Sequence, residues 1–170
     1  MLRLRMHLRM LTAPDPTWLG NQLAGCQKIF PLLGIEIPAP HQSTADFRGG
    51  VVRVGGCDNA ALTQDQVDLF GQRTLLASNE ILVIIAGSLD PGWGGCAVFP
   101  SGQPGLVLPA GPPFDPEWIL AHELGHVLGL FHINDDPSRL MYPSTLWTLG
   151  ITPTLTQEQT DTVRQSDLLK

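Results

Sequence analysis

Three of the five histidines in this 170-residue chain fall in one stretch, His122-Glu-Leu-Gly-His-Val-Leu-Gly-Leu-Phe-His132. Its first five residues make the H-E-x-x-H pattern that binds zinc on a helix. Residues four apart lie on one helix face, with Cβ atoms about 5–6 Å apart. His122 and His126 can therefore offer two imidazole nitrogens to one ion, at the distance of about 2.0–2.1 Å that zinc requires.

The carboxylate of Glu123 stands beside this pair. On a helix it is rotated about 100° from His122, so it borders the metal without pointing at it. A carboxylate there can deprotonate a zinc-bound water, whose pKa the metal lowers to about 7, and can pass the proton to a leaving amine. We therefore expect Glu123 to be the general base of a hydrolase.

The third histidine reaches the metal only if the chain turns. A continued helix would carry His132 about 15 Å beyond His122. Gly129 can end the helix, because glycine adopts the left-handed conformation without steric cost. Three protein ligands then leave a fourth position for water or a substrate carbonyl, which is the pattern of a catalytic zinc site.

The stretch His122–His132 and the segment Leu140–Pro143 together resemble the metzincin clan of zinc endopeptidases, and the triplet Met-Tyr-Pro resembles its matrixin, or matrix-metalloproteinase-like, branch. These motifs span about 22 residues, and the remaining chain agrees in layout. Ile133 stands where matrixins usually have serine, and their glycine-rich loop for a structural zinc and calcium has no counterpart. Tyr142 directly follows the methionine, so the zinc-reaching tyrosine of astacins and serralysins is not carried over.

The resemblance implies a zinc-dependent endopeptidase with one catalytic Zn²⁺ and protein or peptide substrates. By that resemblance, Met141 packs beneath the ligand imidazoles, Glu123 is the general base, and the zinc ligands are His122, His126 and His132. It also implies an active-site cleft between an upper subdomain, residues 1–131, and a lower one, residues 132–170. Secretion is favoured for the same reason.

Substrate would lie along an exposed sheet edge, because an extended peptide can add itself to such an edge by backbone hydrogen bonds. We assign this edge to Cys96–Phe99, with Ala97, Val98 and Phe99 as substrate-binding residues. The segment Ser144–Leu149 would form a pocket wall. Leu146 and Trp147 indicate an apolar pocket there, although both could simply fill the lower core.

Other interpretations stay open. A surface helix that happens to carry histidines is disfavoured, because the five fixed residues would coincide in this composition with a probability of about 10⁻⁵. A catalytically silent zinc-binding interaction module of the same fold is the main alternative, and a zinc hydrolase acting on another bond is a third. Substrate profiling separates them.

Composition fits one domain with a real core, since hydrophobic residues make up 43% of the chain and charged residues 15%. A net charge of −6 argues against a nucleic-acid partner. The longest apolar run, residues 81–89, is too short to span a membrane. We expect a monomer. The glycine-rich loop at residues 90–95 could bind calcium but offers one carboxylate, so a plain connecting loop is favoured.

The first residues alternate apolar and polar side chains, which predicts a strand from Leu2 to Leu11 and no signal peptide. Either the protein is intracellular, or Met1 begins a domain trimmed to its mature form. The polar face of that strand is expected to be solvated, with a basic docking stripe as the alternative; it comprises Arg3, Arg5, His7 and Arg9.

The three cysteines have separate expectations. Cys26 falls on the apolar stripe of a helix and is expected in the core. Cys57 and Cys96 each follow glycine near a strand end and could pair in an oxidising compartment. Their connectivity cannot be read from the sequence.

The order of elements predicts an α+β, zincin-like metzincin fold: a twisted, mainly parallel five-stranded sheet with one antiparallel edge strand, backing helices, an active-site helix, a methionine turn and a C-terminal helix. Residues 39–50, with His41, are expected to be a polar loop. The expected strands, after the first, are Ile35–Ile37, Val51–Val54, Ile81–Ala86, Cys96–Phe99 and Leu106–Leu108. Capping signals predict helices at Asp15–Leu33, Thr63–Ala77, from Asp115-Pro116 to Gly129, and at Gln157–Leu168.

Overall fold

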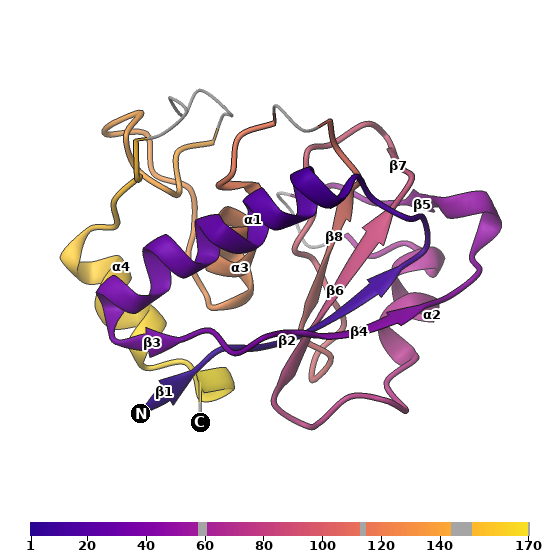
Figure 1. Ribbon diagram of the computed structural model, residues 1–170, viewed down its shortest axis with the longest axis horizontal. Coiled ribbons are helices and arrows are strands. Elements are labelled where there is room, and N and C mark those ends of the chain that lie inside the picture. Colours follow the sequence, from indigo (N-terminus) through magenta and orange to yellow (C-terminus); the bar gives the residue numbers. More distant parts are fainter. Residues whose placement is uncertain (58–60, 113–114, 144–150, 170) are drawn as a thin grey trace.

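The computed structural model describes residues 1–57, 61–112, 115–143 and 151–169 (Figure 1). Its main sheet has four strands in the order β4-β2-β6-β8, and every pairing in it is parallel. The strands are β2 (Arg5–Met10), β4 (His41–Thr44), β6 (Glu80–Ala86) and β8 (Gly105–Pro109). The predicted mixed fold with a mainly parallel sheet is therefore confirmed.

Two short parallel pairs extend the chain outside this sheet. One pairs β1 (Leu2–Arg3) with β3 (Ile35–Glu36). The other pairs β5 (Val51–Arg53) with β7 (Ser88–Asp90). The chain thus enters and leaves the main sheet through brief extended segments, as the prediction of strands near residues 2, 35 and 51 required.

Three details of the predicted sheet are wrong. The main sheet has four strands instead of five, because β5 pairs with β7 outside it. The supposed polar loop contains strand β4, whose lack of apolar alternation hid it because an edge strand needs little burial. The expected antiparallel strand Cys96–Phe99 is reduced to a single bridge, in which Cys96 and Val107 exchange two hydrogen bonds of 2.9 Å. Over the described ranges, the antiparallel edge is therefore one residue pair long.

The prediction that the basic face of the first strand is solvated is wrong for two of its four residues: Arg3 is exposed and Arg5 is half-buried, but His7 and Arg9 are buried. His7 and Arg9 are only 3% and 4% exposed. The side chain of Arg9 reaches the C-terminal cap of helix α2 (Gln64–Gly71), where Nη1 donates to the Gln72 carbonyl at 2.6 Å. Helix α2 therefore covers a part of this face that was predicted to be exposed to solvent. The guanidinium group of Arg9 donates a hydrogen bond to a backbone carbonyl instead of to water.

The helix starts follow their capping signals. Asp15 Oδ1 accepts from Thr17 N and Trp18 N at 2.8 and 3.0 Å, at the start of α1 (Pro16–Ile29). Complete capping boxes begin α2 and α4 (Gln157–Arg164). The helix ends are earlier than predicted, because short 3₁₀ turns at Phe30–Leu33 and Asp167–Leu169 replace the last turns of α1 and α4.

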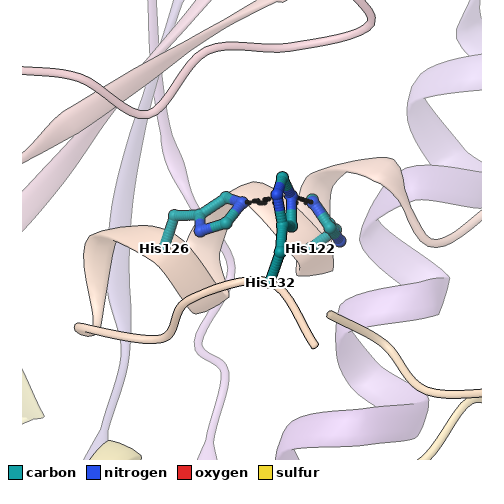
Figure 2. A group of neighbouring side chains, drawn as sticks. All are labelled: His122, His126 and His132. Carbon is teal, nitrogen blue, oxygen red and sulfur yellow. Dashed lines mark hydrogen bonds between the residues drawn. The ribbon is translucent and has the colours of Figure 1, made fainter. Parts of the chain in front are cut away.

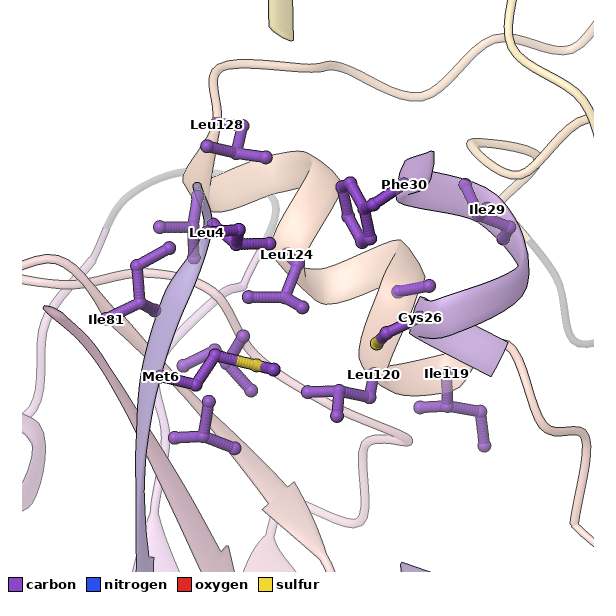
Figure 3. Packing of buried hydrophobic residues seen from close by; sticks show 14 of the residues in the cluster. Leu4, Met6, Cys26, Ile29, Phe30, Ile81, Ile119, Leu120, Leu124 and Leu128 are labelled. Carbon is purple, nitrogen blue, oxygen red and sulfur yellow. The ribbon is translucent and has the colours of Figure 1, made fainter. Parts of the chain in front are cut away.

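The core lies on both faces of the sheet. Alternate side chains of the strands point to opposite faces. Residues such as Met6 and Ile81 pack against helices α1 and α3 (Ile119–Val127), where Cys26 is fully buried as predicted (Figure 3). Residues such as Leu82 and Ile84 pack on the other face with Leu69 and Phe70 of α2. Helix α3 is thus held against one face of the sheet through its own apolar side.

The start of α3 was predicted wrongly. The helix begins after Trp118, and no side-chain hydrogen bond caps it from within its own segment. Gln22 of α1 does so from a distance: its Oε1 accepts from Leu120 N at 3.0 Å and its Nε2 donates to the Pro116 carbonyl at 2.8 Å. Gln22 is fully buried. A tertiary cap therefore replaces the expected one at Asp115.

Cys57 and Cys96 form a disulfide. The bond ties the loop after β5 to the residue that bridges β8. Cys26 keeps a free thiol, whose pKa is raised by burial.

None of the helices in the described part of the chain has the length and apolar character of a membrane span, and α1, of 14 residues, is the longest.

Candidate metal centre

The three motif histidines converge on one point (Figure 2). The Nε2 atoms of His122 and His126 are 3.2 Å apart, and each lies 3.1 Å from Nε2 of His132. Two of the rings come from α3 and the third from the segment after it. The chain therefore gathers three nitrogens into a nearly equilateral triangle, as the spacing predicted.

The protonation of these rings follows from their other nitrogens. Nδ1 of His122 lies 2.6 Å from the Leu140 carbonyl, and Nδ1 of His126 lies 2.8 Å from the Leu130 carbonyl. A carbonyl oxygen only accepts, so each Nδ1 carries the proton and donates it. In the neutral ring the Nε2 lone pair is then left to face the triangle. Backbone carbonyls commonly orient metal-binding histidines in this way.

This arrangement fits a zinc ion. Tetrahedral zinc with bonds of about 2.0–2.1 Å holds its ligand nitrogens about 3.3–3.4 Å apart, close to the separations observed. Lone pairs of His122 and His126 that face each other at 3.2 Å repel, and a cation between them turns that repulsion into attraction. The donor set of three imidazoles is also one that zinc prefers.

Burial favours the metal-binding form of His122. The pKa of this residue is lowered to about 3, mainly by desolvation and also by the neighbouring His126 and His132, while the hydrogen bond with Leu140 acts in the opposite direction. The ring is therefore neutral across the physiological range. His132 is exposed, so the centre opens to solvent on its side.

Gly129 provides the turn that brings in the third ring. It has φ 98°, a left-handed conformation that favours glycine. Around it, Gly129 N donates to the His126 carbonyl at 3.0 Å and Leu130 N to the Gly125 carbonyl at 2.9 Å. This helix ending is the one that the sequence predicted, and it also turns the Leu130 carbonyl toward His126.

Met141 is fully buried under the helix that carries the histidines. A Cβ placed on Gly125 would lie 2.6 Å from Met141 Sδ, so the sulfur occupies the space that glycine leaves. The Met141 carbonyl accepts from Ile133 N at 3.0 Å. The methionine turn thus contacts both α3 and the segment after it, which carries His132.

Glu123 lies on α3 beside the first ligand and is 8% exposed. Gly95 leaves space for its carboxylate: a Cβ on Gly95 would lie 2.5 Å from Glu123 Oε1. Gly95 was not among the predicted site residues, because its contact with Glu123 bridges 28 positions of sequence. Only its glycine type and its place before Cys96 could have marked it.

The predicted substrate-binding residues are only partly placed. Ala97, Val98 and Phe99 follow the Cys96 bridge and are half-buried, and the Val98 carbonyl accepts from Gln66 Nε2 at 3.1 Å. Leu146 and Trp147 lie outside the described residues, as does the whole of the predicted pocket wall, Ser144–Leu149.

Residues 85–166 match the matrixin family, Peptidase_M10. Among solved structures, the fold is similar to metalloproteinase-II from Bacteroides fragilis, with a TM-score of 0.69 and 15% identity over 97% of this chain and 53% of that chain. It is also similar to archaemetzincin from Methanopyrus kandleri, with a TM-score of 0.63 and 17% identity over 96% and 95% of the two chains. The chain spans about half the length of the Bacteroides protein. No curated protein sequence matches it.

The fold is that of the zincin-like metalloproteinases found among these neighbours. The matrixin match over residues 85–166 supports a matrixin-like metzincin domain. The matrixin family implies zinc, and His122, His126 and His132 could bind a metal ion.

Proposed function

We propose that the chain is a zinc-dependent endopeptidase. The observation that carries the proposal is the triangle of three imidazole nitrogens at 3.1–3.2 Å, with a carboxylate on the next residue of the same helix. A zinc ion supplies Lewis-acid polarisation of the scissile carbonyl and of water. His122, His126 and His132 would hold the ion, and the exposure of His132 leaves the centre open to solvent on that side.

Glu123 acts as the general base in this proposal. Its carboxylate takes a proton from the attacking water and delivers it to the leaving amine. Its 8% exposure and the contact with Gly95 restrict where the carboxylate can lie, which favours a fixed base over a mobile surface acid. Met141 and Gly129 support the ligands without touching substrate.

Substrate is proposed to lie along Ala97–Phe99, extended beside the sheet edge, and against a pocket that includes Leu146 and Trp147. The cleft would divide residues 1–131 from residues 132–170. The two parts share one core, because Leu140, Met141 and Val163 belong to the same buried cluster as α1 and α3. We therefore propose two lobes of one domain.

The proposed location of the protein is outside the cell. A disulfide between Cys57 and Cys96 is typical of oxidising compartments, which supports secretion. The substrates would be proteins or peptides, and the active form a monomer.

The test is digestion of an unfolded protein such as casein by the purified chain, with zinc measured in the same sample. Glu123→Gln should lose about 10²–10⁴-fold of the rate while keeping its zinc, because only the proton transfer is removed. Glu117→Gln is the matched control: this acid precedes the same helix and pairs with Lys28 at 2.7 Å, so its loss should leave the rate intact.

A wild-type chain that binds zinc but cleaves no member of a broad peptide library would instead establish the silent zinc-binding module. Equal cleavage by wild type and Glu123→Gln would remove this carboxylate from the mechanism.

A further inference from the structure

A second group of possible metal ligands lies away from the motif. A ring nitrogen of His7, one of His41 and a carboxylate oxygen of Glu80 all lie within 4.8 Å of one another. These residues belong to the adjacent strands β2, β4 and β6, and His7 is the direct neighbour of His41 in the register. His7 pairs with Leu82, which packs on the α2 side of the sheet, whereas the histidines of α3 belong to the other side. The two groups are therefore separate.

The polar contacts of the group leave one buried nitrogen unused. His7 Nε2 lies 2.7 Å from Ser43 Oγ, and His7 Nδ1 is buried with no hydrogen-bond partner within the described ranges. An imidazole nitrogen in that position loses its hydration and gains nothing. His7 itself is 3% exposed. A metal ion that accepts the lone pair of this nitrogen would compensate for the lost hydration.

Glu80 is also buried, and its carboxylate is held by hydrogen bonds. Its carboxylate is 3% exposed; Oε2 accepts from Ala77 N at 2.8 Å, and Oε1 lies 2.6 Å from His41 Nδ1. The side chain of His41 is 73% exposed, which provides access from solvent. The group thus combines two buried, oriented donors with one exposed donor at the sheet edge.

We propose that His7, His41 and Glu80 form a second divalent-cation site, with solvent completing the coordination. The ligand set of two imidazoles and one carboxylate suits zinc and neighbouring transition metals. Calcium and magnesium are disfavoured, because they require several oxygen ligands and Glu80 is the only carboxylate of the three.

The surroundings keep His7 in the form that binds a metal. Burial lowers its pKa, and Arg9 and His41 lower it further, while Glu80 opposes them. Arg9 and Arg73 direct their guanidinium groups at carbonyls, those of Gln72 for Arg9 and of Pro104 and Glu80 for Arg73. Both arginines also disfavour added positive charge, so the site should bind its ion more weakly than the three-histidine centre.

A bound ion would join three strands that are distant in sequence. Strand β4 is at the edge of the sheet, and its residues otherwise gain little from burial. A metal ion bound by His41, His7 and Glu80 together would hold the edge strand β4 on β2 and β6. The site is therefore structural: it stabilises the sheet and takes no part in hydrolysis.

The experiment is zinc analysis of the untagged chain after equilibrium dialysis, for wild type and four variants. We expect two zinc ions in wild type and one in His41→Ala, with peptidase activity retained. Glu80→Gln keeps the side-chain shape and should also bind one. His132→Ala should bind one ion and lose activity. Gln42→Ala, an exposed neighbour on the same edge strand, is the matched control and should bind two.

The outcomes separate the two sites. One zinc in wild type that is lost in His132→Ala and kept in His41→Ala overturns the second site and leaves the proposed protease intact. One zinc lost in His41→Ala and kept in His132→Ala supports the second site and removes the catalytic assignment. Two ions in both His41→Ala and Glu80→Gln would also overturn the proposal. Circular dichroism on each variant identifies misfolding, and because His41 is exposed, its replacement should not unfold the chain.

Discussion

Gly95 lies so close to the proposed base that one added methyl group should displace it. In Gly95→Ala the new Cβ would meet Glu123 Oε1 at 2.5 Å, and Glu123 Cγ and Cδ at 2.7 Å. Ordinary contacts begin near 3.4 Å, so the carboxylate must move by about 0.9 Å. The side chain of Glu123 can rotate, whereas the backbone at Gly95 is held beside the Cys96–Val107 bridge. The base should therefore move and the fold should stay.

A displacement of about 1 Å at a reacting group costs on the order of 10²-fold in rate. We accordingly expect kcat of Gly95→Ala to fall about 10²-fold, with KM changed little and one zinc retained at the three-histidine centre. Steady-state kinetics on a quenched fluorescent peptide, with zinc analysis of the same preparation, measure all three quantities. We expect the proposed zinc ligands to be unaffected, because the three atoms nearest to the added Cβ all belong to Glu123.

Gly94→Ala is the matched control, since a Cβ there meets nothing within 4 Å. It should retain the wild-type kcat. A full kcat in Gly95→Ala would refute the reasoning, because the base would then tolerate the displacement. Equal losses in both variants would refute it too, since they would indicate a general effect on the loop.

Three further changes test the support of the site. Gln22→Ala removes both hydrogen bonds at the start of α3 and should lower the free energy of unfolding by about 1–3 kcal/mol in urea titrations. Replacing Cys57 and Cys96 together by alanine opens a loop of 39 residues and should cost at most about 4 kcal/mol, measured by thermal unfolding. In metal-free protein the pKa of His122 falls from 6.5 to about 3 on folding, so stability present above pH 6.5 is lost as the pH falls toward 3. Between pH 6.5 and 5 wild type should lose about 2 kcal/mol more than His122→Gln, and an equal loss would exclude this residue as the cause.

The convergence of the three histidines could be predicted because its geometry is local. The spacing of four residues on a helix and the glycine that ends it determine where His122, His126 and His132 lie, and few other parts of the chain are needed. The same holds for the helix starts at Asp15 and Thr63, where the capping side chain bonds to backbone within three residues. Most features that depend on short sequence separations were therefore found, with the start of α3 as the exception, where the distant Gln22 replaces the local cap.

The failures concern residues whose environment is made by distant parts of the chain. His7 and Arg9 were predicted to be exposed to solvent, because nothing in their own strand shows that residues of α2 and β4 lie over them. His41 was predicted to lie in a loop for a related reason. Strand β4 has no apolar pattern, and only its pairing with β2 identifies it as a strand. Polar residues buried by tertiary contacts have no period that distinguishes them from exposed ones.

The zinc helix shows how the local and distant contributions combine. Its histidines are spaced by the helix itself, yet its first turn is capped by Gln22, which is 98 residues away, and the space for its proposed base, Glu123, is limited at Gly95, 28 residues away. A motif in isolation therefore specifies which atoms can bind zinc, but not the position of the neighbouring carboxylate that is proposed to act as the base. Because that position is set by contacts with α1 and with the segment before Cys96, changes at Gln22 or Gly95 should alter stability or catalysis without altering the metal ligands.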